Sequence, residues 1–103
     1  MKYKKQRPQR TPSHPGEVLN ELWLKELGHT QSEFAQILSD ISPTGVTKRA
    51  MQTKLNEVIK GKRAVSAEFA VLIGLALKTS PRMWLGLQMN YDLWKAQEEL
   101  NVA

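Results

Sequence analysis

The spacing of apolar residues most strongly constrains the fold, because they recur every three or four positions along most of the chain. This spacing is typical of amphipathic helices, and no competing stretch alternates polar and apolar residues as a strand would. Thr30 and Glu33 match the capping box T-x-x-E at the start of a helix. Pro81 suits a first helical turn, and Gly28 and Gly61 suit helix ends. We therefore predict an all-α fold.

Five helices account for the pattern. Besides Thr30, the side chains of Thr47 and Ser66 can cap helices, and Pro43 interrupts the chain because it disfavours helical geometry at Ser42. The predicted helices span about residues 16–27, 30–38, 47–60, 66–77 and 81–100. The remaining residues 1–13 are polar, basic and proline-containing, so we predict a flexible basic arm followed by a single domain over residues 14–103.

The composition excludes several classes of protein. The chain has no cysteine, which rules out a disulfide scaffold, cysteine-ligated zinc and thiolate catalysis. Its two histidines, His14 and His29, are too few for a usual zinc site, and no nucleophile or carboxylate cluster accompanies them. We therefore expect no metal, no cofactor and no enzymatic activity. No apolar run is long enough to span a membrane, and none follows the basic N-terminus as in a signal peptide, so we expect a cytoplasmic protein.

The charge of the chain is unevenly distributed. The net charge is +5, which favours an anionic partner. Six basic residues lie between Gly45 and Arg63 with Glu57 as the only acid, whereas residues 16–40 carry five acids against Lys25 alone. The basic run is either a solvated helix face or a surface for nucleic acid. Basic residues also gather in the first ten positions, where they either reach the minor groove of DNA or form a solubilising tail.

The second and third predicted helices, with the turn between them, match what insertion into the major groove of DNA requires. Amide-bearing and hydroxyl side chains on the third helix, Gln52, Thr53 and Asn56, can pair with base edges. A helix N-terminus attracts phosphate through its free N–H groups, so Thr30 and Gln31 suit contacts to the DNA backbone. The same contacts are expected from the basic residues just after the third helix, which are Lys60, Lys62 and Arg63.

The last predicted helix is apolar around most of its circumference. Trp84, Leu87, Tyr91 and Trp94 follow one stripe of it, and further leucines and methionines lie on its other sides. Such a helix needs more than one neighbour to cover it. We predict that one side packs on its own domain and another on a second subunit, rather than that the aromatic stripe is a platform for single-stranded nucleic acid.

The segments HPGEVLNELWLKELGHTQSEFAQIL and LNEVIKGKRAVSAEFAVLIGLALKTSPRMWLGLQMNYDLWKA resemble the HigA/VapI-type antitoxins, a branch of the phage-repressor-like (XRE) helix–turn–helix proteins. The resemblance spans about residues 14–96. It implies a five-helix, lambda-repressor-like domain that dimerises on a palindromic operator in double-stranded DNA, usually its own promoter. It also implies a partner, a small basic HigB-like toxin that cleaves mRNA.

The turn between the second and third helices departs from this family. Members usually have a short turn, whereas SDISPTGVTKRA intervenes here. Counting back from Gly61 aligns Met51 with the usual capping position, so Gln52, Thr53 and Asn56 inherit the base-reading positions. Lys48 and Arg49 then fall on an extra turn without a family counterpart and are additional candidate DNA contacts.

Two matters stay open at the level of sequence, the function and the surface that would contact a toxin. The protein is either an antitoxin or a stand-alone, phage-type repressor without a toxin. A third reading, from another class, is a protein-interaction module that has lost DNA binding. If there is a toxin, either the acidic first helix or the C-terminal segment QEELNVA contacts it.

Overall fold

The computed structural model describes residues 11–101, and within them every regular element is a helix. The first helix is continuous but has three parts, α1 (Pro15–Val18), the π-helical η1 (Leu19–Leu24) and α2 (Lys25–Leu27). The other four are α3 (Gln31–Ile41), α4 (Lys48–Ile59), α5 (Ala67–Leu77) and α6 (Pro81–Leu100). The predicted all-α, five-helix fold is confirmed. The predicted arm lies outside the described residues except for residues 11–13, which are not helical.

The helices begin where the sequence provides caps. Thr30 and Glu33 form the complete capping box, in which each side chain accepts the backbone N–H of the other residue at 3.0 Å. The hydroxyl oxygens of Thr47 and Ser66 accept N–H groups of the first turns of α4 and α5, each at 3.2 Å. The second helix runs further than predicted, to Ile41, because only Ser42, directly before the proline, must leave helical geometry.

The sequence HPG fastens the first helix to the end of α4. Nδ1 of His14 accepts the N–H of Gly16 at 2.9 Å and caps the helix, and Pro15 occupies its first turn. The imidazole also meets the ring of Tyr91 edge-on, with 5.0 Å between centroids. A Cβ on Gly16 would lie 1.8 Å from the carbonyl oxygen of Val58, so only glycine allows this approach of the two backbones. His14 is therefore a structural residue at the junction of three helices.

The core lies between the first helix and α3, α4, α5 and the start of α6. Trp84 is fully buried there, and its indole N–H donates to Thr79 Oγ1 at 2.7 Å. Gln88 is a buried polar residue that ties α6 to the segment before α5, because its Oε1 accepts the N–H of Val65 at 2.9 Å. The other large, fully buried side chains are apolar and come from the first helix and from α3, α4 and α5: Pro15, Leu19, Leu24, Phe34, Leu38, Met51, Leu55, Val58, Phe69 and Ile73.

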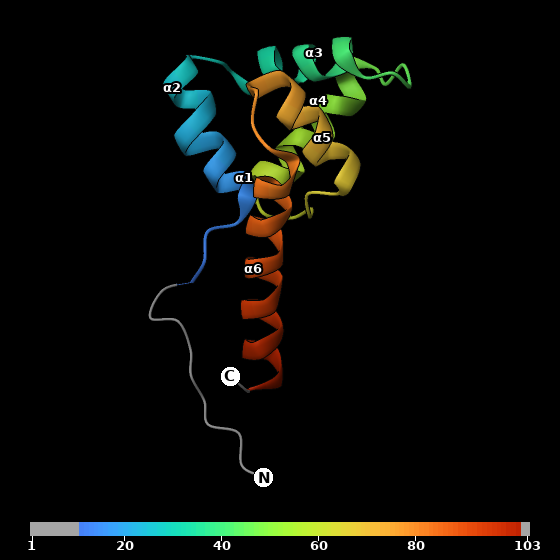
Figure 1. Ribbon diagram of the computed structural model, residues 1–103. Coiled ribbons are helices and arrows are strands. Elements are labelled where there is room, and N and C mark those ends of the chain that lie inside the picture. The colour runs from blue at the N-terminus through green and yellow to red at the C-terminus, as the bar shows by residue number, and fades with distance from the viewer. Residues whose placement is uncertain (1–10, 102–103) are drawn as a thin grey trace.

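The C-terminal half of α6 extends away from the other helices, which gather at its N-terminal half (Figure 1). Trp84 and Gln88 anchor the helix in the domain. Beyond them Tyr91 packs against His14 and lies 6.0 Å from the ring of Trp94. Trp84 and Tyr91 of the predicted aromatic stripe therefore contact the domain itself, and the exposed side of the helix carries Met89, Leu93 and Leu100.

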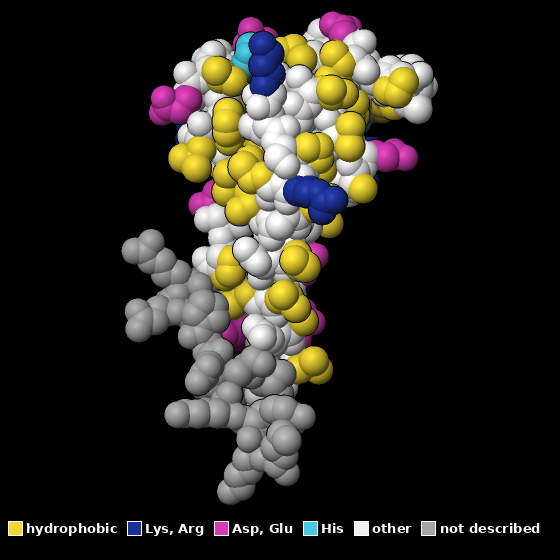
Figure 2. Space-filling model, in the orientation of Figure 1, with side chains coloured by type: hydrophobic (Ala, Val, Ile, Leu, Met, Phe, Trp, Pro, Cys, Tyr) yellow, Lys and Arg dark blue, Asp and Glu magenta, His cyan; other side chains and the backbone are white. Residues whose placement is uncertain are grey.

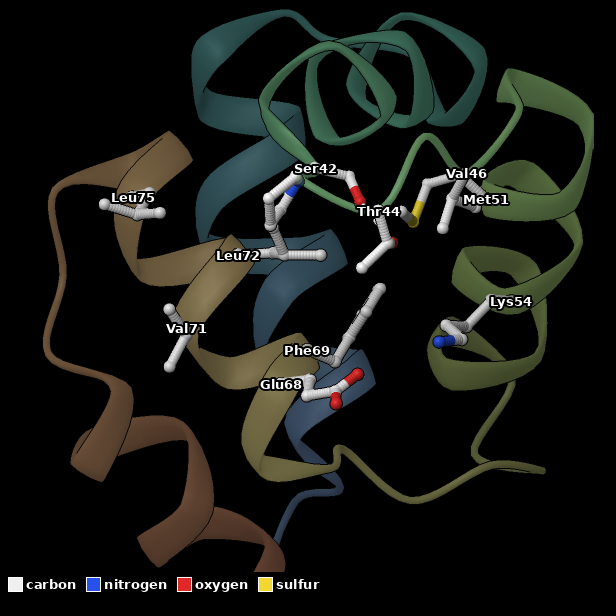
Figure 3. Close-up of a pocket in the computed structure, with 11 residues that line it drawn as sticks. Ser42, Thr44, Val46, Met51, Lys54, Glu68, Phe69, Val71, Leu72 and Leu75 are labelled. Carbon is white, nitrogen blue, oxygen red and sulfur yellow. Dashed lines mark hydrogen bonds between the residues drawn. The ribbon is translucent and has the colours of Figure 1, made fainter.

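The long turn between α3 and α4 closes over α5. Ser39 Oγ donates to the carbonyl of Val46 at 2.6 Å and fixes the turn to the end of α3. Met51, aligned by family comparison with a capping position, instead lies inside α4 and is fully buried, because Thr47 starts the helix one turn earlier. Under the turn lies an apolar hollow of about 330 Å³ between α4 and α5, whose lining includes Phe69 and Leu72 (Figure 3).

Candidate nucleic-acid interface

A hollow of about 330 Å³ on the surface of α3 and α4 collects half of the residues predicted to contact DNA. Gln31, at the first position of α3, lies opposite Gln52, Thr53 and Asn56 of α4 in its lining. Asn56 Nδ2 donates to Gln31 Oε1 at 3.0 Å, which joins the two helices across the hollow. Gln52 and Asn56 are half-buried and Thr53 is exposed, so base edges can reach all three from solvent. The structure thus brings the three candidate base-reading residues together.

Arg49, predicted only as an additional candidate contact, lines the same hollow. It lies three residues before Gln52 and seven before Asn56, which is the spacing of one helix face. Thr53 Oγ1 donates to the carbonyl of Arg49 at 3.2 Å, so the hydroxyl proton already has a partner. Glu57, which the sequence shows as the only acid of the basic run and which was not predicted to lie at a DNA contact, completes the lining. Helical spacing counted from the Thr47 cap places Arg49 and Glu57 on this face of α4 and is the sequence signal that could have predicted their positions.

Basic side chains stand at both ends of α4. Lys48 and Arg49 form its exposed first turn, and Lys60, Lys62 and Arg63 are exposed just beyond its last turn. The twelve residues of α4 extend about 18 Å at 1.5 Å per residue, whereas the major groove is about 12 Å wide. A helix lying in the groove would therefore hold polar groups near its centre against bases and cations near its ends against phosphates.

The basic residues after α4 are not equivalent. Arg63 Nη2 lies 3.4 Å from each carboxylate oxygen of Glu57, an exposed ion pair that a phosphate would compete for. Lys60 lines a second, polar hollow with His14 and Glu17. Lys62 makes no ion pair or side-chain hydrogen bond within the described part of the chain. The same holds for Lys60, so both lysines, unlike Arg63, can contact a phosphate without first giving up an ion pair.

The N-terminus of α3 has two free backbone donors. The N–H groups of Thr30 and Glu33 are used by the capping box, while those of Gln31 and Ser32 have no acceptor among residues 11–101. Hydrogen bonds from Thr30 hold the pKa of Glu33 below its ordinary value, so this carboxylate is charged at neutral pH. The predicted phosphate contact at this helix end therefore depends on the amides of Gln31 and Ser32 rather than on the amide of Thr30.

The described residues contain no group of three or more acidic or histidine side chains placed to hold a metal ion. Burial lowers the pKa of His14, while the nearby Asp92 and Glu17 oppose that shift. The resulting neutral imidazole matches its role as acceptor in the cap of the first helix. None of the helices formed by residues 11–101 is both long and apolar enough to cross a bilayer.

The capped pair α3 and α4, with amide side chains in a hollow between them, defines a helix–turn–helix protein of the repressor-like class. No protein-family model matches the chain. Among individual proteins, the chain is 39% identical over 95 residues to virulence-associated protein A' of Dichelobacter nodosus. This match covers 89% of this chain and 73% of that protein. The solved antitoxin GraA shares 32% identity and a TM-score of 0.74, over 87% of this chain and 86% of that one.

A third relative was solved with DNA. The structure of Pseudomonas aeruginosa antitoxin HigA with the higBA promoter shares 28% identity and a TM-score of 0.72, over 85% of each chain. The chain belongs to the HigA/VapI-type antitoxins, a family of helix–turn–helix transcriptional regulators. The resemblance inferred from the sequence is confirmed, and this family agrees with the expectation that the chain is not an enzyme.

Proposed function

We propose that this protein binds a palindromic operator in the promoter of its own operon as a homodimer, represses that operon, and neutralises a small basic toxin that cleaves mRNA. The observation that carries the DNA-binding part is the hollow in which Gln31 and Asn56 meet beside Arg49, Gln52 and Thr53. These side chains supply donors and acceptors for base edges. Cations at both ends of α4 supply contacts to phosphates.

Support for the operator comes from the family. The relative from Pseudomonas aeruginosa was solved with its own promoter, and the same helix–turn–helix core is present here with a TM-score of 0.72. The antitoxin role follows from the family in the same way. Such a regulator acts on DNA and on a newly made toxin inside the cell, so we expect it in the cytoplasm.

Dimerisation is supported by the exposed side of α6. Met89, Leu93 and Leu100 are large apolar residues at spacings of four and seven, and Ala96 lies between the last two. This is the a/d spacing of a helix that pairs with another helix. A second copy of the chain would cover the stripe, and two recognition helices about 34 Å apart would then meet successive major grooves. Leu93→Glu should give a monomer in sedimentation experiments, whereas Asn90→Glu, also exposed on α6, should leave a dimer.

The test of DNA binding is a gel shift and footprint on the DNA upstream of the coding sequence. The wild-type protein should protect a palindrome. Gln52→Ala and Asn56→Ala should each reduce the preference for that sequence, with each lost base contact worth about 1–3 kcal/mol. Lys62→Ala should weaken binding to all sequences alike and reduce the salt dependence by about one ion. Unchanged operator preference in both amide variants would refute the assignment of base-reading residues.

A further inference from the structure

The outer side of the first helix carries apolar side chains that nothing in the fold covers. Leu22 is 63% exposed and Leu27 is 53% exposed, although both follow the apolar spacing of the helix. Val18 lies four residues before Leu22 and Trp23 lies four before Leu27, and both are half-buried at the edge of the core. The exposed leucines thus extend the core outward onto the surface instead of standing alone among polar residues.

The same helix also exposes acidic residues. Glu17, Glu21 and Glu26 are exposed, and Lys25 is the helix's only cation. Lys25 pairs with Glu21 at 2.9 Å, so it neutralises one of the three carboxylates. Glu26 forms neither an ion pair nor a side-chain hydrogen bond with any residue between 11 and 101. The helix therefore presents apolar side chains in a field of net negative charge.

This surface is separate from the candidate DNA interface. None of its residues lines the hollow formed by Gln31, Arg49, Gln52, Thr53 and Asn56. Its carboxylates would repel phosphates, so its charge is wrong for DNA. Hydrophobic and acidic side chains share the outer edge of the first helix, at the upper left of the molecule (Figure 2).

The chemistry of this surface points to one kind of partner. Leucines exposed on a helix of net negative charge, beside the unpaired carboxylate of Glu26, fit a protein that has an apolar patch bordered by lysine or arginine, because complementary charge steers and orients such contacts. A second copy of the chain would bring carboxylates against carboxylates, which disfavours self-association here. The heptad-spaced apolar stripe on α6 has the geometry to pair with a second copy of the chain, whereas the first helix has the negative charge to bind a basic protein.

We infer that the exposed face of the first helix, formed by Leu22 and Leu27 with Glu21 and Glu26, is the docking surface for the basic toxin. This inference rests on the proposed antitoxin function and adds to it the place of contact. It selects the acidic first helix over the C-terminal segment, which the sequence alone had left open. Because the docking surface is separate from the hollow on α3 and α4, the protein can hold its toxin and its operator together.

The test uses the full chain and, as probe, the purified product of the adjacent reading frame. Leu22→Ser combined with Leu27→Ser removes the apolar contact without adding charge, and Glu26→Lys reverses a free carboxylate. Leu75→Ser is the matched control, because Leu75 on α5 is 65% exposed but lies outside this surface. Affinity for the probe is measured by calorimetry, and a gel shift on the upstream DNA reports whether each variant retains its fold.

The expected result is a loss of at least about tenfold in affinity for the probe in the double serine variant, as for residues central to an interface. Glu26→Lys should also bind more weakly, and the difference from wild type should shrink as salt rises. Leu75→Ser should match wild type, and all variants should shift DNA equally. Wild-type affinity in the double variant would overturn the docking surface and leave the antitoxin function intact. If the wild-type protein shifts DNA but does not bind the probe, the antitoxin function fails, and the docking surface fails with it.

Discussion

Replacing Gly16 by alanine should destabilise the protein more than any other change of one methyl group in the first helix. The added Cβ would lie 1.8 Å from the carbonyl oxygen of Val58, 2.5 Å from its carbonyl carbon and 2.9 Å from the Cα of Ile59. These atoms belong to the backbone of α4, so no rotamer change can relieve the overlap. To restore an ordinary contact of at least 3.4 Å to the oxygen, the two helices must separate by about 1.6 Å.

The size of the effect follows from this geometry. Overpacking of a protein core costs about 1–3 kcal/mol, and a rigid backbone obstacle places this substitution at the upper end or above it. Since 1 kcal/mol shifts the melting temperature of a domain of this size by about 4–8 °C, Gly16→Ala should lower it by about 10–20 °C. Circular dichroism during heating, with urea denaturation as a second measurement, gives the value.

A second glycine provides the control. Gly86 lies inside α6, and a Cβ there would meet nothing within 4 Å. Gly86→Ala should therefore stabilise the protein by about 0.5–1 kcal/mol through the helix propensity of alanine. If Gly16→Ala melted within about 3 °C of wild type while Gly86→Ala behaved as expected, the close approach of the first helix to α4 would be wrong.

Three further predictions concern polar side chains. Gln31→Ala and Asn56→Ala should be non-additive in operator affinity, because each loses the same mutual hydrogen bond; a double-mutant cycle with zero coupling would contradict this. Burial lowers the pKa of His14 below 6.5, so as the pH falls this imidazole is protonated in the unfolded chain before it is protonated in the folded one. The stability of the fold should therefore be full above about pH 7 and should fall as the pH drops through 6.5 toward the folded-state pKa. Urea titrations across this range should show a smaller pH dependence in His14→Asn, which keeps a cap acceptor but does not titrate. Gln88→Leu should cost about 1–3 kcal/mol in urea denaturation by leaving a buried backbone N–H without an acceptor, whereas a neutral effect would mean that water replaces the amide.

Local chemistry made the helix boundaries predictable. Thr30, Thr47 and Ser66 cap helices because a hydroxyl three residues before a free N–H needs no tertiary partner to make that bond. Gly28 and Gly61 end helices with φ of 72° and 74°, a conformation that glycine adopts freely. These signals depend only on neighbours in the sequence, and therefore they can be read from it.

Features that depend on packing were not predictable in the same way. Nothing near His14 in the sequence shows that its imidazole meets Tyr91, and nothing near Gln88 shows that it accepts from Val65. The sides of α6 were interpreted only in part, since an all-round apolar helix does not reveal which side the domain covers. The contact between Gln31 and Asn56 joins residues 25 positions apart, so it could be predicted only with knowledge of how α3 packs on α4.

The candidate base-reading residues were found because they lie on one face of a helix whose end is marked by Gly61. The position of Arg49 in the same hollow was not predicted, for a related reason. Alignment to the family placed the helix start near Met51, whereas the local cap at Thr47 places it one turn earlier. Where a local capping signal and a family alignment disagree, the structure follows the local signal in this chain.

The junction between the first helix and α4 also fixes the direction in which the recognition helix can vary in length. Its C-terminal end is held by the backbone of Gly16 and by the turn at Gly61, while its first three residues are exposed and follow the turn that Ser39 fastens. A longer or shorter turn would leave the register of Leu55 and Val58 in the core unchanged, because both lie in the C-terminal half of α4. The turn is thus a natural point for diversification, where new operator preferences can arise by insertion or deletion while the rest of the domain keeps its sequence and its stability.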